Sequence, residues 1–357
     1  MKLPSLAHRP AFSAGFQQAT LALLVAAAAL TGAQPAHAAI PGDATHSLPP
    51  VEAVAARTEV RTGAAANPWW AAYGEAPLDQ LMAQGQSVPG LGAQNELVQS
   101  YVLMRVQQVR LGLATQLLQA LQTERELLRR QSPTRETGQA VAVVDQRISY
   151  AAGLVSNFVQ VRDAAAQRLV QQAAQDNEGV RRAVMAALSQ DSLPEFRATV
   201  PDRLPAAVLL TRDDVASLRG ELAAEGQGEL ALNGWISAAT AAPAAPALER
   251  ELQARSPDQT LRQAGLEVSW SLRQLTEARA AAAADAQRLD ARRLEVMAAK
   301  QRADLGDVAP TDVLETYLRF LSDADTAAQS QGVLALAWAA MHRQAPGTWQ
   351  MLSASSR

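Results

Sequence analysis

Apolar residues recur at helical spacing along two unusually long stretches of this chain. In the first stretch, residues 97–130, they follow one another at steps of three, four or seven residues. They include Leu97, Tyr101, Met104, Leu111, Ala114, Leu118, Leu121 and Leu128. A helix rises about 1.5 Å per residue, so this pattern predicts one helix about 50 Å long. Ser132, Pro133 and Gly138 interrupt the pattern, and a return helix is predicted over 141–174.

The same pattern occurs a second time later in the chain. The matched residues are Leu97 and Leu266, Ser100 and Ser269, Tyr101 and Trp270, Leu103 and Leu272, Val106 and Leu275, and Arg110 and Arg279. Ser256, Pro257 and Gln259 are typical of a helix start, so a very long helix is predicted from there to about Leu305. The repetition predicts a second hairpin of the same kind as the first.

Glycine and threonine mark the second predicted turn. Gly306 is expected to end the long helix in a left-handed backbone conformation. Thr311 is expected to cap the last helix, which should finish near Pro346 and Gly347. Another threonine, Thr211, can cap a short helix over 212–224.

Helices of this length cannot bury an apolar stripe on a compact core, so they are expected to pair lengthwise. The sequence therefore predicts an all-α fold of duplicated long antiparallel helical hairpins with a coiled-coil character and little or no β-strand. Residues 226–247 are the one plausible strand region. A compact helical bundle is the alternative.

The aromatic segment 67–74 is expected to pack the N-terminal part of the chain against the helical hairpins. A platform for a ligand is the other interpretation.

Composition and charge exclude several classes of protein function. The chain is 48% apolar but only 4% aromatic, which suits close-packed alanine-rich helices. Its net charge of −3 gives no basic surface for nucleic acid. Cysteine is absent, so disulfides and lipidation at a cleavage site are excluded. Ala33 stands where a lipoprotein would carry its cysteine, which indicates either a decayed lipidation motif or a chance match.

Residues 1–38 have the pattern of an export signal. Lys2 and Arg9 precede an apolar run over 19–30, and Ala36 and Ala38 are the small residues that a signal peptidase requires. The apolar run is shorter than the ~20 residues that a membrane-spanning helix needs, although an uncleaved anchor is the alternative. Residues 39–66, rich in Ala, Pro, Thr and Gly, are expected to be a disordered linker.

The residues that carry catalysis in other proteins are nearly absent. His46 and His342 are the only histidines after the predicted signal, and they lie far apart in the sequence. The adjacent Asp213 and Asp214 are better explained by the dipole of a helix start than by acid–base chemistry. Gly226, Gln227 and Gly228 lack the strand–loop–helix setting of a phosphate loop. We therefore expect no enzyme, no cofactor, no catalytic residue and no metal site.

Four segments point to a known family. They are Asn67–Leu81, with the sequence NPWWAAYGEAPLDQL; Val200–Val215, which joins a Leu-Pro pair to LLTRDDV; Gly306–Leu314, GDVAPTDVL; and the tail from Trp338 to Trp349. Together they resemble the TolC-type outer membrane efflux proteins, and the internal duplication agrees with the two-repeat build of that family. The resemblance covers nearly all of the chain after residue 66.

The chain departs from the family pattern at several points. Asp213 stands where the family usually has proline, and the first turn keeps Gly138 without the Thr-Asp-Val order that follows Gly306. Only fourteen residues separate Met82 from Leu97. The family places an extra helix and a two-stranded hairpin there, and each membrane strand takes about 9 to 11 residues. The segments of the membrane barrel are therefore expected to be largely missing.

The resemblance implies domains, partners and a working site. It divides the chain into a signal peptide (1–38), a linker (39–66), a first repeat (67–205, hairpin 97–175) and a second repeat (206–349, hairpin 257–345). Members of the family form homo-trimeric export ducts in the outer membrane, and their turns meet periplasmic adaptor proteins that serve inner-membrane pumps. The residues expected to make that contact are Gly138, Gln139, Ala140, Val141, Gly306, Asp307, Thr311, Asp312 and Val313. The alternative is a non-transporting periplasmic coiled-coil scaffold or modulator. Either way, the cell envelope is the expected location, as outer membrane or periplasm.

Overall fold

The computed structural model describes residues 68–84, 91–173, 178–194, 196, 206–224 and 256–345. All of them belong to one compact unit, residues 44–357. The described part is helical throughout and contains no strand, so the all-α prediction is confirmed for these residues. The predicted signal peptide, the linker 39–66 and the strand region 226–247 lie outside the described residues.

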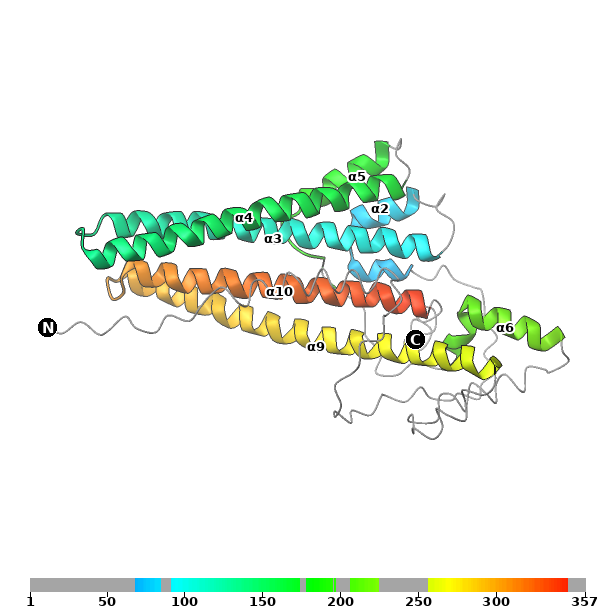
Figure 1. Ribbon diagram of the computed structural model, residues 1–357. Coiled ribbons are helices and arrows are strands. Elements are labelled where there is room, and N and C mark those ends of the chain that lie inside the picture. The colour runs from blue at the N-terminus through cyan, green and yellow to red at the C-terminus, as the bar shows by residue number, and fades with distance from the viewer. Residues whose placement is uncertain are drawn as a thin grey trace, which may run out of the picture. The chain divides into compact units, whose positions relative to one another are not determined.

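Two long hairpins dominate the unit (Figure 1). The first consists of α3 (Leu91–Arg129) and α4 (Arg135–Gln172), and the second of α9 (Ser256–Asp304) and α10 (Pro310–Gln344). The partners of each hairpin run antiparallel along their length, and α3 packs on α10 between the hairpins. The four long helices therefore lie side by side in the order α4, α3, α10, α9, and we call this arrangement the row. The two turns lie at the same end of the row.

The predicted ends of the four long helices agree with the structure to within a few residues, but the return helix predicted over 141–174 begins earlier, at Arg135. The helix predicted over 97–130 begins earlier, at Leu91, and the predicted fifty-residue helix is α9 with 49 residues. Short elements complete the described unit. They are η1 (Trp69–Tyr73), α2 (Ala76–Gln84), α5 (Glu178–Leu188), η3 (Ala206–Thr211) and α6 (Asp213–Ala224).

A shared apolar cluster joins the hairpins towards their turns. Ala120 and Leu121 of α3, Ala151 of α4, and Leu318 and Leu321 of α10 form its buried centre. Alanine at these positions lets the helix axes approach closely, and the leucines fill the space between them. The hairpins are thus held together by packing that spans three helices.

One glycine marks a close approach of α3 and α10. A Cβ atom added to Gly332 would lie 2.6 Å from Cγ2 of Val106, inside van der Waals contact. Valine has one strongly preferred rotamer in a helix, so it cannot turn away freely. Only glycine therefore allows the two hairpins to approach this closely here.

We expect Gly332→Ala to lower the free energy of unfolding by about 1–2 kcal/mol, because overpacking costs more than the gain in helix propensity. Val106→Ala in the same chain should remove the clash and recover part of that loss. Urea denaturation of the two single variants and the double variant measures the coupling. Strictly additive effects would show that the two residues do not compete for space.

The aromatic segment at the N-terminal end of the described chain packs against α10, which confirms the predicted docking. Trp69 and Tyr73 of η1 are buried, and Trp338 of α10 donates a hydrogen bond from Nε1 to the carbonyl oxygen of Trp69 at 3.2 Å. The Tyr73 hydroxyl donates to the carbonyl oxygen of Ala335 at 2.8 Å. Burial of the Tyr73 phenol raises its pKa well above the usual value. The segment is therefore bonded to the C-terminal half of α10.

Among the described helices, none combines the length and the apolar character needed to cross a lipid bilayer.

Candidate functional site at the turn end of the hairpins

The second turn has the geometry that the sequence predicts for a glycine stop. Gly306 has φ of +81°, the left-handed conformation that glycine adopts without strain. Its N–H donates to the carbonyl oxygen of Ala303 at 3.0 Å, and the N–H of Asp307 donates to that of Arg302 at 2.9 Å. These two bonds form a Schellman motif, which satisfies the last carbonyls of α9. Gly306 therefore fixes the direction in which the chain leaves the helix.

The cap of α10 differs from the prediction. The N-cap residue is Ala309, without a side-chain hydrogen bond, and Pro310 occupies the first helical position. Thr311 lies inside the first turn, so its predicted capping role is wrong. Proline replaces the cap because its fixed φ suits the start of a helix and it has no N–H to satisfy. Asp312 in the same turn is exposed and favourably placed for the helix dipole.

The first turn is built without glycine. It consists of residues 130–134, and Gly138 lies inside the first turns of α4 instead of interrupting the chain. Thr134 caps α4: its hydroxyl accepts from the N–H of Thr137 at 3.1 Å, and the Thr137 hydroxyl accepts from the N–H of Thr134 at 2.8 Å. A threonine that follows proline and precedes an acidic first turn is the sequence signal for this cap.

The predicted contact residues lie on or next to the two turns, and most are accessible. Five are exposed and four are half-buried. Exposed are Gly138, Gln139, Gly306, Asp307 and Asp312; half-buried are Ala140, Val141, Thr311 and Val313. Because both turns lie at one end of the row, the structure brings these two groups to the same end of the unit (Figure 1).

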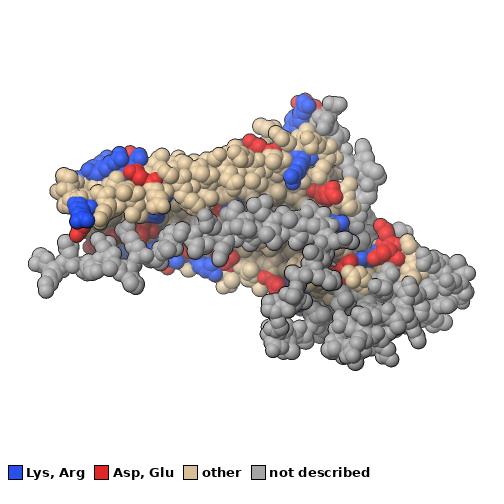
Figure 2. Space-filling model, viewed as in Figure 1, with Lys and Arg blue, Asp and Glu red and all other residues tan. Residues whose placement is uncertain are grey.

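The two turns carry charges of opposite sign. Arginine predominates around the first turn, where Arg129, Arg130 and Arg135 are exposed beside Glu136. Aspartate predominates around the second, where Asp304, Asp307 and Asp312 lie near Lys300 and Arg302. Figure 2 shows charged side chains gathered at the turn end and a long uncharged stretch behind them. A partner that covers both turns would have to present both signs of charge.

Replacing Gly306 with valine should lower the free energy of unfolding by about 1–3 kcal/mol, because valine is strained at positive φ. Gly153→Val is the matched control, since Gly153 is exposed in α4 and nothing lies within 4 Å of the added Cβ. That control should change stability by less than about 0.5 kcal/mol. Urea denaturation compares them, and equal losses would argue against a special role of Gly306.

Polar bonds stiffen each hairpin behind its turn. Arg147 of α4 binds Glu124 of α3 at 3.1 Å, and Arg292 of α9 binds Asp323 of α10 at 2.9 Å. Arg292 also pairs with Glu295 of its own helix, at 2.6 Å. The hydrogen bonds to Asp323 and Glu295 raise the pKa of Arg292, so it remains charged. These bonds keep the helices of each hairpin in register near the turns.

A buried ion pair joins the two hairpins deeper in the unit. Arg110 of α3 binds Asp325 of α10 through two bonds, at 2.7 and 3.1 Å. The Arg110 guanidinium also lies 4.4 Å from the ring centre of Phe158 on α4. Gln329 donates to the same carboxylate at 2.5 Å. Three helices therefore meet at one charge pair, which fixes their lengthwise alignment.

The duplication is not symmetric in burial. Tyr101 and Arg110 of the first repeat are buried, whereas their counterparts Trp270 and Arg279 are exposed, Trp270 by 45%. Leu272 and Leu275 of the second copy are buried, as Val106 is in the first, so the two copies differ only at part of their positions. An exposed tryptophan therefore lies on α9 where the first repeat has a buried tyrosine.

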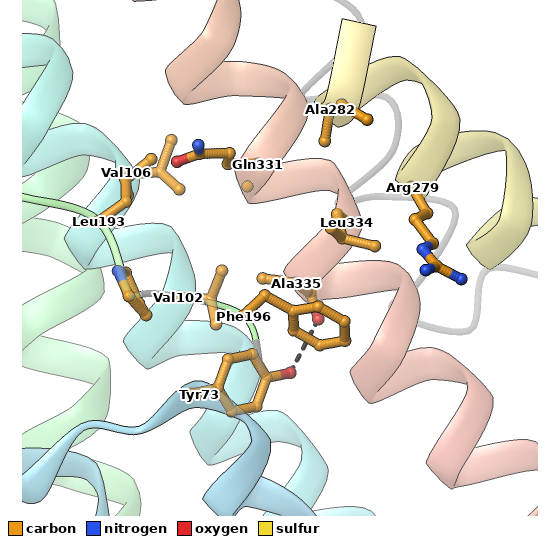
Figure 3. Close-up of a pocket in the computed structure, with 13 residues that line it drawn as sticks. Tyr73, Val102, Val106, Leu193, Phe196, Arg279, Ala282, Gln331, Leu334 and Ala335 are labelled. Carbon is orange, nitrogen blue, oxygen red and sulfur yellow. Dashed lines mark hydrogen bonds between the residues drawn. The ribbon is translucent and has the colours of Figure 1, made fainter. Parts of the chain in front are cut away.

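A cavity of 530 Å³ lies between the hairpins, away from the turns. Figure 3 shows it between α3, α10, α9 and residues after α5 (Leu193, Pro194 and Phe196), with Tyr73 at one end and the Arg279 side chain at another. Val102, Val106 and Phe196 supply apolar walls. No sequence pattern indicates this cavity, since its walls come from five separate segments.

Among the described residues, no group of three or more His, Asp or Glu side chains is arranged to hold a metal ion. The adjacent carboxylates behave as expected of a helix start. Asp214 accepts from the N–H of Val215 at 2.9 Å and pairs with Arg212 at 2.8 Å. The Arg212 hydrogen bond lowers the pKa of Asp214.

Comparison with solved structures places the fold among outer-membrane channels. The chain is similar to the outer-membrane channel OprN, with 18% identity and a TM-score of 0.52 over 77% of this chain and 70% of that one. The open state of the Neisseria gonorrhoeae MtrE outer membrane channel matches at 15% identity and 0.48, over 76% and 72% of the two chains. No protein-family model and no curated protein matches the chain. The predicted resemblance to TolC-type outer membrane channels is thereby confirmed at the level of the helical fold.

Proposed function

We propose that this protein is a TolC-like component of a tripartite efflux system of the cell envelope, acting as an export duct or as part of one. The observation that carries the proposal is the pair of long hairpins, packed side by side with both turns at one end, in the fold of OprN. Such an element works by its shape and its contacts, without chemistry of its own. Its proposed location is the outer membrane or the adjoining periplasm.

The proposed duct is a ring of three copies of this chain. The row of helices ends in α4 on one side and α9 on the other, and both carry exposed apolar residues. Val143 of α4 is 49% exposed, and Leu294 and Met297 of α9 are 66% and 55% exposed. Val143 lies nine residues after Thr134, and Met297 nine residues before Gly306. At about 1.5 Å per residue the two sites are at the same height above the turns.

This match in height supports a head-to-tail interface. A contact between α9 of one copy and α4 of the next uses two different surfaces, so it repeats around a ring until the ring closes. Trp270 of α9, the counterpart of the buried Tyr101 of α3, is also exposed, as a residue of an interface between copies would be in the single chain. Burial of these side chains in an assembly would remove apolar surface from water.

The proposed partners are a periplasmic adaptor and, through it, an inner-membrane pump. The contact surface is the turn end, with Gly306, Asp307, Thr311, Asp312 and Val313 in the second turn and 138–141 beside the first. Both turns are accessible and carry charge, which suits recognition by a protein partner. Gly306→Val should reduce efflux and adaptor binding by changing the direction of the turn.

A charge reversal tests the adaptor contact without a change of backbone. Asp312→Lys should weaken adaptor binding by about tenfold, since like charges across an interface repel. Asp290→Lys is the matched control, because Asp290 is exposed in the same hairpin but far from the turns. Pull-down with the adaptor measures both variants. Equal binding by the wild type and both variants would contradict the contact at this turn.

The alternative function is a non-transporting periplasmic scaffold or modulator of a pump. The short connection between α2, which ends at Gln84, and α3, which begins at Leu91, favours it, because the resemblance places further segments there. Fractionation of the cell envelope separates the two functions. A trimer that detergent extracts from the outer membrane, and whose electrophoretic mobility changes on heating, would support the duct. A species released with the periplasm would support the scaffold.

A further inference from the structure

A histidine without hydrogen-bond partners is buried where the N-terminal segment meets α10. His342 has no exposed surface, and neither of its ring nitrogens has a hydrogen-bond partner among the described residues. A buried polar group is normally paired, because burial removes its bonds to water. This histidine is therefore tolerated only in its neutral form and requires an explanation.

Two tryptophans enclose the imidazole. The ring of Trp69 is stacked on it, with the ring centres 5.1 Å apart and an angle of 19° between the planes. The ring of Trp338 meets it edge to face, with the centres 4.5 Å apart. Trp69 comes from η1 and Trp338 from α10, so the histidine lies in the interface that docks the N-terminal segment. Nε1 of Trp69 also lacks a hydrogen-bond partner in the described structure.

We propose that His342 is the release element of a pH-sensitive latch, which holds the segment Trp69–Tyr73 against α10 at neutral pH and frees it in an acidic medium. A charged imidazolium would have two N–H donors and a positive charge in a site where neither nitrogen has a hydrogen-bond partner among the described residues. Attraction to the two indole faces offsets only part of that cost, because a buried charge needs hydrogen bonds as well. Release of Trp69 lets water reach the ring. This inference does not depend on the proposed function.

The charged and titratable groups at this end do not compensate the imidazolium. Tyr73 of η1 is neutral and bonds the carbonyl oxygen of Ala335. The others are Glu75, which follows η1; Glu96 on α3; Arg212 before α6; Glu267 on α9; and Arg343 on α10. Glu75 pairs with Arg105, and Arg212 pairs with Asp214 and Glu267. Desolvation is the cause that lowers the pKa of His342, to about 3.

The sign of the pH dependence follows from that shift. Once the segment Trp69–Tyr73 is released and water reaches the ring, His342 has an ordinary pKa near 6.5, whereas with the segment docked it stays neutral down to about pH 3. The equilibrium constant for docking of the segment is therefore highest above pH 6.5. It falls about tenfold for each pH unit below 6.5, until the docked form also protonates near pH 3. Release would also remove Tyr73 from the wall of the cavity in Figure 3.

Hydrogen exchange of the purified full chain tests the latch. Between pH 7.5 and pH 5, after correction for intrinsic exchange rates, protection of 69–73 should fall by about 30-fold in the wild type. His342→Phe keeps an apolar ring in the site and should show no such fall. The segment Val144–Phe158 of α4 is the internal reference and should keep its protection. Unchanged protection of 69–73 in the wild type, an equal fall in His342→Phe, or an equal fall in the reference segment would each overturn the proposal.

A second measurement keeps the test valid if His342→Phe does not fold. Exchange of the imidazole C2–H, followed by mass spectrometry, reports the pKa of His342 in the wild type and in Trp69→Ala. The wild-type pKa should lie well below the ordinary value, and removal of the Trp69 ring should raise it towards 6.5. An ordinary pKa in the wild type, or one that Trp69→Ala leaves unchanged, would overturn the latch.

Discussion

Replacement of Arg105 with methionine is expected to lower the free energy of unfolding by about 3–5 kcal/mol, because it leaves a buried carboxylate without its partner. Arg105 and Glu75 are both buried, with 3.1 Å between Nη2 and Oε1. Tyr101 donates to the same carboxylate from its hydroxyl. Burial and the Glu75 charge raise the pKa of Tyr101, so the phenol stays protonated as the donor.

Arg105 also binds the chain that follows α5. Its Nη1 donates to the carbonyl oxygens of Ala187 at 2.8 Å and Gln190 at 2.7 Å, and its Nη2 donates to that of Ser192. The Ala187 carbonyl lies in the last turn of α5, where it also accepts from the N–H of Gln190 at 3.2 Å, and the other two lie in the chain just after that helix. The substitution should therefore loosen α2 and α5 from α3 at the same time.

Arg125→Met is the control for Arg105→Met. Arg125 lies in the same helix, α3, and pairs with Asp145 at 3.5 Å in a partly exposed site. Its replacement should cost less than about 1 kcal/mol, as is usual for exposed pairs. Urea denaturation measures both variants. Similar losses in the two would contradict the role of the buried Arg105 network.

The second large effect is expected at the ion pair between the hairpins. Asp325→Leu should cost about 3–5 kcal/mol, because Arg110 is then buried without a counter-charge. The double variant Arg110→Met with Asp325→Leu should be more stable than Asp325→Leu alone, since two apolar residues leave no uncompensated charge. Urea denaturation of both single variants and the double variant gives the coupling. A double variant that loses the sum of the single losses would contradict a direct pair.

The helices could be predicted from sequence because their signals are local. Apolar residues at steps of three and four over dozens of positions leave little room for another structure, and Gly306 marks a turn that only glycine makes easily. Thr311 and Gly138 show the limits of such local signals. Proline at the first helical position replaced the threonine cap, and the Thr134 cap moved the first turn away from the glycine.

The buried polar contacts could not be predicted, because their partners are far apart in the chain. Arg110 meets Asp325, and Arg105 meets Glu75, only after the hairpins and the N-terminal segment have packed. Arg110 was visible as part of the duplicated pattern, but its copy Arg279 is exposed. The pattern alone therefore could not separate an internal interface from an outward surface. His342 was likewise visible as a rare histidine, with no sequence signal for its tryptophan neighbours.

Cross-linking between copies tests the proposed ring of hairpins, and because the chain has no native cysteine only the introduced thiols can react. The variant with Val143→Cys and Met297→Cys carries one thiol on α4 and one on α9, at matching heights above the turns. With a short bis-maleimide in the cell envelope, we expect cross-linked dimers and trimers, with the trimer as the largest species. Monomers alone, or a ladder that continues beyond three copies, would contradict a closed ring of side-by-side hairpins.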